Sequence, residues 1–212
     1  MIETVAVIDY GCGNLASVQK AILGLGHKPE IVHDPSTLLS FDRAILPGVG
    51  SFNSAMEEIR RLGFHDSILD FCGSGKPLLG ICLGMQLLAT SGQEGASGHE
   101  TEQTSGLNLI PGKVIALRSL GVELPVPHVG WNSLSLLQSS DLFDGIQTEA
   151  DVYFVHSFGF VPADTTDLLA YTEHGLQISA IIARGNVTGC QFHPEKSSKV
   201  GSRILSNWMQ SC

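Results

Sequence analysis

Short apolar runs alternate with segments of helical periodicity over roughly the first ninety residues of the chain. The apolar runs read TVAVIDY, PEIVHD, RAILPG and PLLGI, and the helical segments include SVQKAILGLG, FNSAMEEIRRLG and FHDSILDFCGSG. Nearly unbroken apolar strands that alternate with helices are typical of a parallel sheet covered on both faces, with sites at the carboxyl ends of the strands. We therefore predict a three-layer α/β fold, with a mixed, mostly parallel central sheet and helices on both faces.

The second half of the chain has a different pattern. Its polar stretch at 92–106 predicts an exposed loop. The short β-rich runs GKVIALR, DVYFVH, LLAYTEH, LQISAIIA and VTGCQF follow, and we expect them to add antiparallel strands to the edge of the sheet before a terminal helix, SKVGSRILSNWMQ. Because no internal repeat or linker divides the chain, we predict one domain over residues 1–212.

The charge of the chain indicates which kinds of molecule it is suited to bind. It carries 12 basic against 21 acidic residues, a formal net charge of −9, and has no run of Lys or Arg. This balance argues against nucleic acid or an anionic membrane as a partner and favours small molecules or proteins. No apolar run approaches the ~18 residues of a membrane span, and no basic leader precedes the first strand, so we expect a cytoplasmic protein.

A cysteine stands at the corner between a predicted strand, KPLLGI, and a predicted helix, LGMQLLATS. The sequence there is Gly80-Ile81-Cys82-Leu83-Gly84, the cysteine form of the G-x-S-x-G nucleophile elbow. Glycines flank a nucleophile in such a sharp turn because side chains have no room there, and helix N–H groups that point at the sulfur favour a reactive thiolate. On this motif alone, a packed core cysteine is an equal alternative.

A second motif, QFHPEKS, follows the predicted strand VTGCQF. Pro194 keeps the segment extended, so that His193 and Glu195 project to the same side. The imidazole then exchanges a proton with the Cys82 thiol while the carboxylate holds its tautomer, which makes a Cys-His-Glu triad. The alternative for His193 is an ordinary loop histidine. The eight histidines show no metal-ligand spacing, and the five scattered cysteines are typical of reduced thiols, so we predict no metal site.

GICLGMQ together with QFHPE resembles the class I glutamine amidotransferases, whose Cys-His-Glu triad hydrolyses glutamine to glutamate and ammonia. The further stretches DYGCGN, LPGVGSF, PHVGWN and YFVHSF narrow the resemblance to the glutaminase subunits of imidazole glycerol phosphate synthases, enzymes of histidine biosynthesis. The resemblance covers essentially the whole chain. It implies a flavodoxin-like core, a single glutaminase domain and no cofactor.

The resemblance also implies roles for individual residues. Cys82 would be the nucleophile, His193 the acid and base, and Glu195 the residue that orients it. The backbone N–H groups of Val49, after a peptide flip that Gly50 makes sterically cheap, and of Leu83 would stabilise the oxyanion. The residues that would bind glutamine are Gln86, Glu94, His156, Ser157 and Phe158, although Gln86 has the alternative of a plain polar helix residue, and Glu94 ends a GQE where the family usually has SEE.

The partner that the resemblance implies is a (β/α)8-barrel cyclase, bound as a heterodimer through Asn14, Trp131, Asn132 and Lys196. Ammonia would pass to it through a dry channel, because ammonia is protonated in water and loses its nucleophilicity. The products would be imidazole glycerol phosphate and aminoimidazole carboxamide ribotide.

Three other functions stay open from the sequence. YFVHSFGF has SF where SY is commoner after VH, and with the long polar stretch it also resembles paralogues that supply ammonia to sugar-modifying synthases for surface polysaccharide. A catalytically silent binding subunit would leave the three triad residues unexplained. A thiol hydrolase or protease would leave Gln86 and the PGVG run unexplained.

Overall fold

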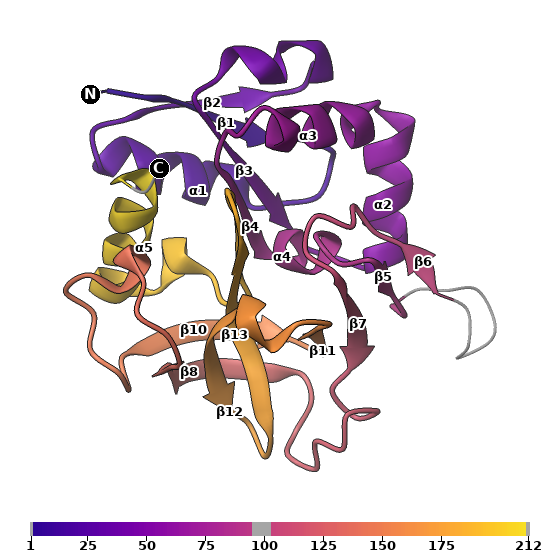
Figure 1. The fold of residues 1–212 in the computed structure, drawn as a ribbon, viewed down its shortest axis with the longest axis vertical. Coiled ribbons are helices and arrows are strands. Elements are labelled where there is room, and N and C mark those ends of the chain that lie inside the picture. The colour runs from indigo at the N-terminus through magenta and orange to yellow at the C-terminus, as the bar shows by residue number, and fades with distance from the viewer. Residues whose placement is uncertain (1, 95–102, 211–212) are drawn as a thin grey trace.

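The computed structural model describes residues 2–94 and 103–210. Its described residues form an eight-stranded central sheet with five parallel strands at one side and an antiparallel group at the other (Figure 1). In sheet order the strands are β2 (Lys28–Val32), β1 (Thr4–Ile8), β3 (Arg43–Gly48), β4 (Leu78–Cys82), β14 (Val187–Cys190), β13 (Gln177–Arg184), β12 (Leu168–Glu173) and β9 (Ser135–Leu136). The mixed, mostly parallel sheet of the prediction is confirmed.

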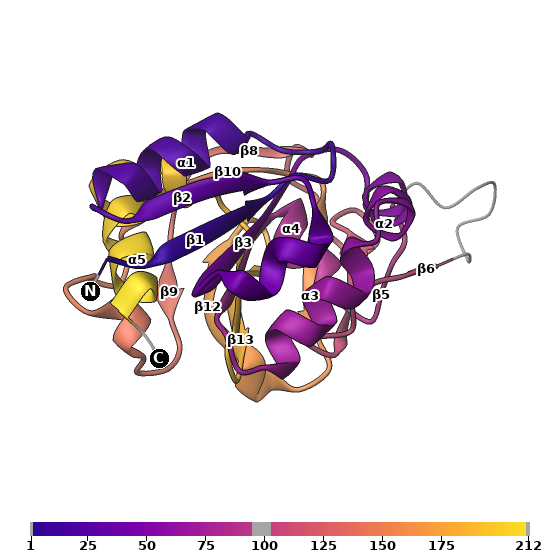
Figure 2. The same cartoon turned by 90° about the horizontal axis from the view of Figure 1, so that it is seen from above.

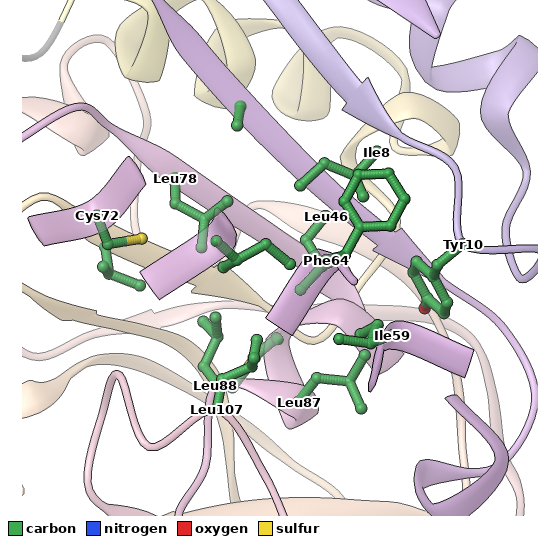
Figure 3. Close-up of a cluster of buried hydrophobic side chains, with 14 of the residues drawn as sticks. Ile8, Tyr10, Leu46, Ile59, Phe64, Cys72, Leu78, Leu87, Leu88 and Leu107 are labelled. Atoms are coloured by element: carbon green, nitrogen blue, oxygen red, sulfur yellow. The ribbon is translucent and has the colours of Figure 1, made fainter. Parts of the chain in front are cut away.

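Helices cover both faces of this sheet (Figure 2). One face packs against α2 (Phe52–Arg61), α3 (Phe64–Gly73) and α4 (Leu83–Leu87), and the other packs against α1 (Leu15–Gly24) and α5 (Ser198–Gln210). The pleat of the strands divides the core in two, because successive side chains of a strand point to opposite faces. Figure 3 shows part of the first core, where Ile8, Leu46 and Leu78 from the strands meet Ile59 and Phe64 from the helices.

Two predicted edge strands belong to separate small sheets, which corrects the expectation for GKVIALR and DVYFVH. β10 (Asp151–His156) pairs with β8 (His128–Ser133), and β7 (Gly112–Ala116) lies between β11 (Phe158–Pro162) and β5 (Ser91–Gly92). β10 buries alternate side chains, among them Val152 and Phe154, against the core that holds α1 and α5. It therefore adds a layer over the sheet and does not extend it, because a strand with one exposed face can cover a core.

VTGCQF also differs from the prediction. β14 runs parallel to β4 and antiparallel to β13, so it lies inside the sheet and not at its edge. Three of its four residues are buried, as expected for a strand covered on both faces. This position places the residues that follow β14 beside the carboxyl end of β4. The predictions for LLAYTEH and LQISAIIA are confirmed, since β12 and β13 are antiparallel neighbours.

The polar stretch at 92–106 is only partly a loop. Gly92 pairs with Thr104, as β5 meets the two-residue strand β6 (Thr104–Ser105), and the middle of the stretch, 95–102, lies outside the described residues. Among the helices of the described ranges, none combines the length and the apolar character that crossing a bilayer requires.

Candidate active site

Cys82 ends β4 and precedes α4, at the corner that the sequence predicts. Its backbone has φ 55° and ψ −111°, a conformation that costs a residue with a side chain of order 1–3 kcal/mol. The flanking glycines permit the turn, because a Cβ on Gly80 would lie 2.6 Å from the carbonyl oxygen of Gly84. Cys82 is 7% exposed, and it lines the cavity described below.

His193 and Glu195 follow β14 and form a pair. The prediction that Pro194 keeps the segment extended is wrong beyond His193, because Pro194–Lys196 form a 3₁₀ helix, in which proline is tolerated at the first position. His193 Nδ1 lies 2.8 Å from Glu195 Oε1, and the side chains are 3% and 1% exposed. Strand β10 holds the histidine backbone, because the N–H of His193 donates to the carbonyl of Tyr153 at 3.0 Å. The hydroxyl of Ser197 adds a second tie, since it donates to the carbonyl of His193 at 2.7 Å and accepts from the N–H of Tyr153 at 2.9 Å.

The charge state of His193 depends on its two neighbours. Burial lowers the pKa of His193, but the interactions with Cys82 and Glu195 together outweigh burial and raise the pKa above its usual range. Within the described residues, Nε2 of His193 has no hydrogen-bond partner. That nitrogen is therefore free to exchange a proton with a thiol or a ligand, while Nδ1 is engaged by Glu195.

A cavity of about 200 Å³ brings most of the predicted site residues together. This small volume suits a ligand the size of an amino acid. A wider depression over residues 136–145, of about 570 Å³, is lined by neither cysteine nor histidine, so it lacks the chemistry of this cavity. The cavity that holds Cys82 is lined by Val49, Gly50, Cys82, Leu83, Gln86, Glu94, Val155, His156, Ser157, Phe158 and His193.

Gln86 and Glu94 reach this cavity from different elements. Gln86 is 4% exposed on α4, and its Nε2 donates to the carbonyl of Phe158 at 3.1 Å and to Oε1 of Gln191 at 3.0 Å. Glu94 lies two residues after the end of β5, and its Oε2 accepts from the N–H of Phe52 at 3.2 Å. Burial raises the pKa of the Glu94 carboxyl. Both residues therefore present polar groups to a ligand despite the unusual GQE sequence.

The PGVG run leaves β3 beside the thiol. Gly48 is the register partner of Cys82, and Val49 and Gly50 come next along the rim of the cavity. Gly50 has φ +111°, in the region that favours glycine, and a Cβ on it would meet no atom within 4 Å. The segment therefore has both the conformational freedom and the space to reorient a peptide group next to Cys82.

The four predicted interface residues lie at the surface or partly buried. Trp131, on β8, is 55% exposed, and its ring meets that of Tyr153 edge-on at 6.0 Å. Its neighbour Asn132 is partly buried and hydrogen-bonded. Asn14 precedes α1, and Lys196 lies in η4 (Pro194–Lys196), which packs against α1.

The class I glutamine amidotransferase family model matches residues 6–212, the whole of the site included. The chain belongs to this family. Within it, the amidotransferase is 42% identical to imidazole glycerol phosphate synthase subunit HisH from Syntrophotalea carbinolica, over 96% of this chain and 98% of that protein. It is 45% identical to the HisH subunit from Methanosarcina barkeri, with each chain covered in full.

Solved structures show the same fold at lower identity. The amidotransferase superposes on the structure of PurLQS from Thermotoga maritima with a TM-score of 0.77, at 19% identity and 99% coverage of both chains. A glutamine amidotransferase from Thermotoga maritima matches with a TM-score of 0.65, at 15% identity, over 99% of this chain and 84% of that one. The predicted family and fold class are confirmed.

Sequence reasoning missed four residues in or beside this amidotransferase's site. Val155 lines the cavity, and its carbonyl oxygen lies 3.8 Å from the sulfur of Cys82. Gln191 is fully buried, and its Nε2 lies 4.0 Å from the sulfur of Cys82. Its position two residues before His193, in the QFHPEKS motif, was the available signal. Ser197 closes the same motif. For His128, the only signal in the sequence was its place in the PHVGWN run, which is a weaker indication than the QFHPEKS motif.

Proposed function

We propose that the chain is the glutaminase subunit of an imidazole glycerol phosphate synthase, acting as one domain over residues 1–212 in the cytoplasm. It hydrolyses glutamine and delivers the ammonia to a (β/α)8-barrel cyclase, which forms imidazole glycerol phosphate and aminoimidazole carboxamide ribotide in histidine biosynthesis. The cavity that Cys82 shares with His193, whose other nitrogen is engaged by Glu195, is the strongest support for this function.

The triad divides the hydrolysis into two steps. His193 takes the proton of Cys82, the thiolate attacks the side-chain amide carbon of glutamine, and a tetrahedral oxyanion forms. Protonated His193 then gives its proton to the amide nitrogen, the C–N bond breaks, and ammonia leaves a glutamyl thioester. Water, deprotonated by His193, attacks the thioester to release glutamate and the thiol. Glu195 keeps the imidazole in the correct tautomer throughout.

The oxyanion is stabilised by the N–H groups of Val49 and Leu83, which flank the sulfur from two elements. In serine proteases, one such donor contributes roughly 10²–10³ in rate. The freedom of Gly50 supports a reorientation of the Val49 peptide. Because the Val49 peptide must reorient before its N–H can donate to the oxyanion, glutamine hydrolysis is slow until the cyclase binds.

Glutamine is bound by groups at both ends of the cavity. The carboxylate of Glu94 attracts the α-ammonium group of the substrate, and Oε1 of Gln86 accepts a hydrogen bond from it. His156, Ser157 and Phe158 line the same cavity, and the carbonyl of Phe158 accepts from Gln86. The small volume excludes a peptide substrate, which argues against the protease alternative.

An apolar patch next to the site is the docking face for the cyclase. It consists of Val129 at 56% exposure, Trp131 at 55% and Val155 at 37%, which lie on the paired strands β8 and β10. A monomer seldom exposes such a group of large apolar side chains without a binding function. Asn14, Asn132 and Lys196 form polar contacts around it, and the heterodimer encloses the ammonia channel.

The surface-polysaccharide paralogue is the second candidate, on the strength of the SF sequence and the long polar stretch. The relatives at 42% and 45% identity carry the name of the imidazole glycerol phosphate synthase subunit, which favours histidine biosynthesis. Copurification of the tagged chain with its partner decides between the two, because each candidate requires a different synthase.

Substitution of the nucleophile tests the function. In the complex, Cys82→Ala abolishes glutamine-dependent synthesis and leaves ammonia-dependent synthesis intact, since added ammonia bypasses the triad. Cys72→Ala is the matched control, because burial raises the pKa of the Cys72 thiol to about 12 and makes it inert. Equal loss of both activities in Cys82→Ala, or equal turnover of the wild type with and without the cyclase, contradicts the proposal.

A further inference from the structure

A line of hydrogen bonds leads from the outer strand β8 towards the Cys82 cavity. Nδ2 of Asn132 lies 3.2 Å from Nε2 of His128, and Nδ1 of His128 lies 3.0 Å from Nε2 of His156. Nδ1 of His156 lies 2.8 Å from the carbonyl oxygen of Phe158, which lines the cavity. The two histidines are 4% and 6% exposed, so solvent does not replace these contacts.

The acceptor at the inner end of the line, the Phe158 carbonyl, determines which atom donates in each of these hydrogen bonds. A carbonyl oxygen can only accept, so Nδ1 of His156 carries a hydrogen, and its Nε2 is the acceptor when the ring is neutral. Nδ1 of His128 must then carry the hydrogen that Nε2 of His156 accepts. That leaves Nε2 of His128 to accept from the amide of Asn132. Burial lowers the pKa of His156 to about 4 and of His128 to about 3, so both rings are neutral at pH 7.

The line continues to the substrate-facing amide of Gln86. The Phe158 carbonyl that accepts from His156 also accepts from Nε2 of Gln86, and the same nitrogen donates to Oε1 of Gln191. Both hydrogens of the Gln86 amide are thereby engaged. Only Oε1 of Gln86 is left for a ligand, so the Phe158 carbonyl and Oε1 of Gln191 together hold the amide in the orientation in which Gln86 offers an acceptor.

We propose that His128 is a positioning residue for glutamine recognition, which acts through His156 and the Phe158 carbonyl to fix the acceptor face of Gln86. The inference rests on the proposed glutaminase function. It also links recognition to the docking face, because Asn132, the outer end of the line, follows the exposed Trp131 and is tied to the carbonyl of Glu173 at 2.8 Å.

His128 also packs between two rings, so the test must separate packing from hydrogen bonding. Its ring stacks on Phe154 at 4.8 Å and on His174 at 4.0 Å, each at 20°. His128→Phe keeps an aromatic ring in this stack and removes both hydrogen bonds. His128→Asn loses the stack but keeps an amide N–H where Nδ1 stands, so it can still donate to His156.

The measurement is steady-state glutamine turnover of each variant in complex with the cyclase, with ammonia-dependent synthesis as the reference. We expect His128→Phe to raise the KM for glutamine roughly tenfold, the effect of leaving a buried acceptor unpaired, with a smaller effect on kcat. His128→Asn restores most of the affinity. His174→Phe, which alters the same stack outside the line, leaves the KM within about twofold of wild type.

A purely structural role for His128 predicts the opposite order, with His128→Phe close to wild type and His128→Asn impaired, and this result overturns the proposal. Loss of ammonia-dependent synthesis in His128→Phe also overturns it, because the residue would then serve assembly of the complex. If His128→Phe does not fold, Asn132→Leu, at the partly exposed outer end, replaces it and is expected to raise the KM about threefold; an unchanged KM overturns the proposal. A wild-type complex without glutamine turnover refutes the glutaminase function itself, a separate outcome.

Discussion

Gly84 lies so close to Leu46 that a Cβ on Gly84 would overlap the carbonyl oxygen of Leu46. The first turn of α4 is thereby pressed against β3, the strand that leads into the PGVG run. Val49, three residues beyond Leu46, lines the Cys82 cavity. The second glycine of the elbow is thus required by packing between two elements, and that packing assembles the site.

Gly84→Ala should destabilise the fold, because the methyl group forces β3 and α4 apart. We expect a loss of roughly 1–3 kcal/mol or more in the free energy of unfolding, measured by denaturant titration. Gly24→Ala is the control, since a Cβ there meets no atom within 4 Å at the end of α1. A helical Gly→Ala change of that kind gains roughly 0.5–1 kcal/mol. Equal stabilities of the two variants would show that the close approach is not required.

Glu195→Gln should lower the pKa of His193, because the carboxylate that helps to raise it becomes neutral. Titration of the His193 ring by NMR measures the shift. Glutamine turnover should fall by roughly 10²–10⁴, the usual contribution of acid–base catalysis, since the imidazolium loses its stabilising partner. Glu173→Gln, at an exposed carboxylate on β12, leaves both quantities unchanged.

The same substitution predicts a change in how stability depends on pH. The folded-state pKa of His193 is raised above its unfolded value of about 6.5, so the ionised pair stabilises the fold fully below that pH. The contribution is lost as pH rises through the folded-state pKa. Wild type should therefore lose stability relative to Glu195→Gln over this alkaline range. Parallel stability curves for the two proteins would contradict the coupling.

The triad could be predicted from the sequence because each half of it is a local motif. The strand and glycines around Cys82 fix the elbow, and His193 and Glu195 are two residues apart, although a 3₁₀ helix and not an extended segment brings their side chains together. The line from Asn132 to Gln86 could not be predicted, since it depends on the register in which β8 pairs with β10, where His128 faces His156. The prediction that DVYFVH joins the main sheet left no place for its pairing with β8. Periodicity shows that a strand has one buried face, but not which layer it covers.

Tyr10→Phe should stabilise the protein. The Tyr10 hydroxyl is buried and, within the described ranges, has no hydrogen-bond partner. It lies close to the backbone of Gly48, because a Cβ on Gly48 would be 2.5 Å from it. An unpaired buried hydroxyl costs roughly 1–3 kcal/mol, so its removal should gain about 1 kcal/mol in thermal or denaturant unfolding. Tyr171→Phe, at a partly exposed position, should change stability by less than about 0.5 kcal/mol. A destabilised Tyr10→Phe variant would mean that the hydroxyl has a bonding role in the folded protein.

Ser197→Ala should reduce both stability and turnover, because one buried hydroxyl connects the His193 backbone to β10. Its removal leaves the N–H of Tyr153 unpaired, at a cost of roughly 1–3 kcal/mol, while the carbonyl of His193 keeps the N–H of Lys196 as a donor. The imidazole then moves relative to the thiol, so we expect kcat for glutamine to fall at least tenfold while ammonia-dependent synthesis is retained. Ser202→Ala, on the exposed side of α5, is the matched control and should match wild type in both measurements. A Ser197→Ala variant with lower stability but unchanged kcat would show that the single bond from His193 to Tyr153 is enough to hold the histidine in place.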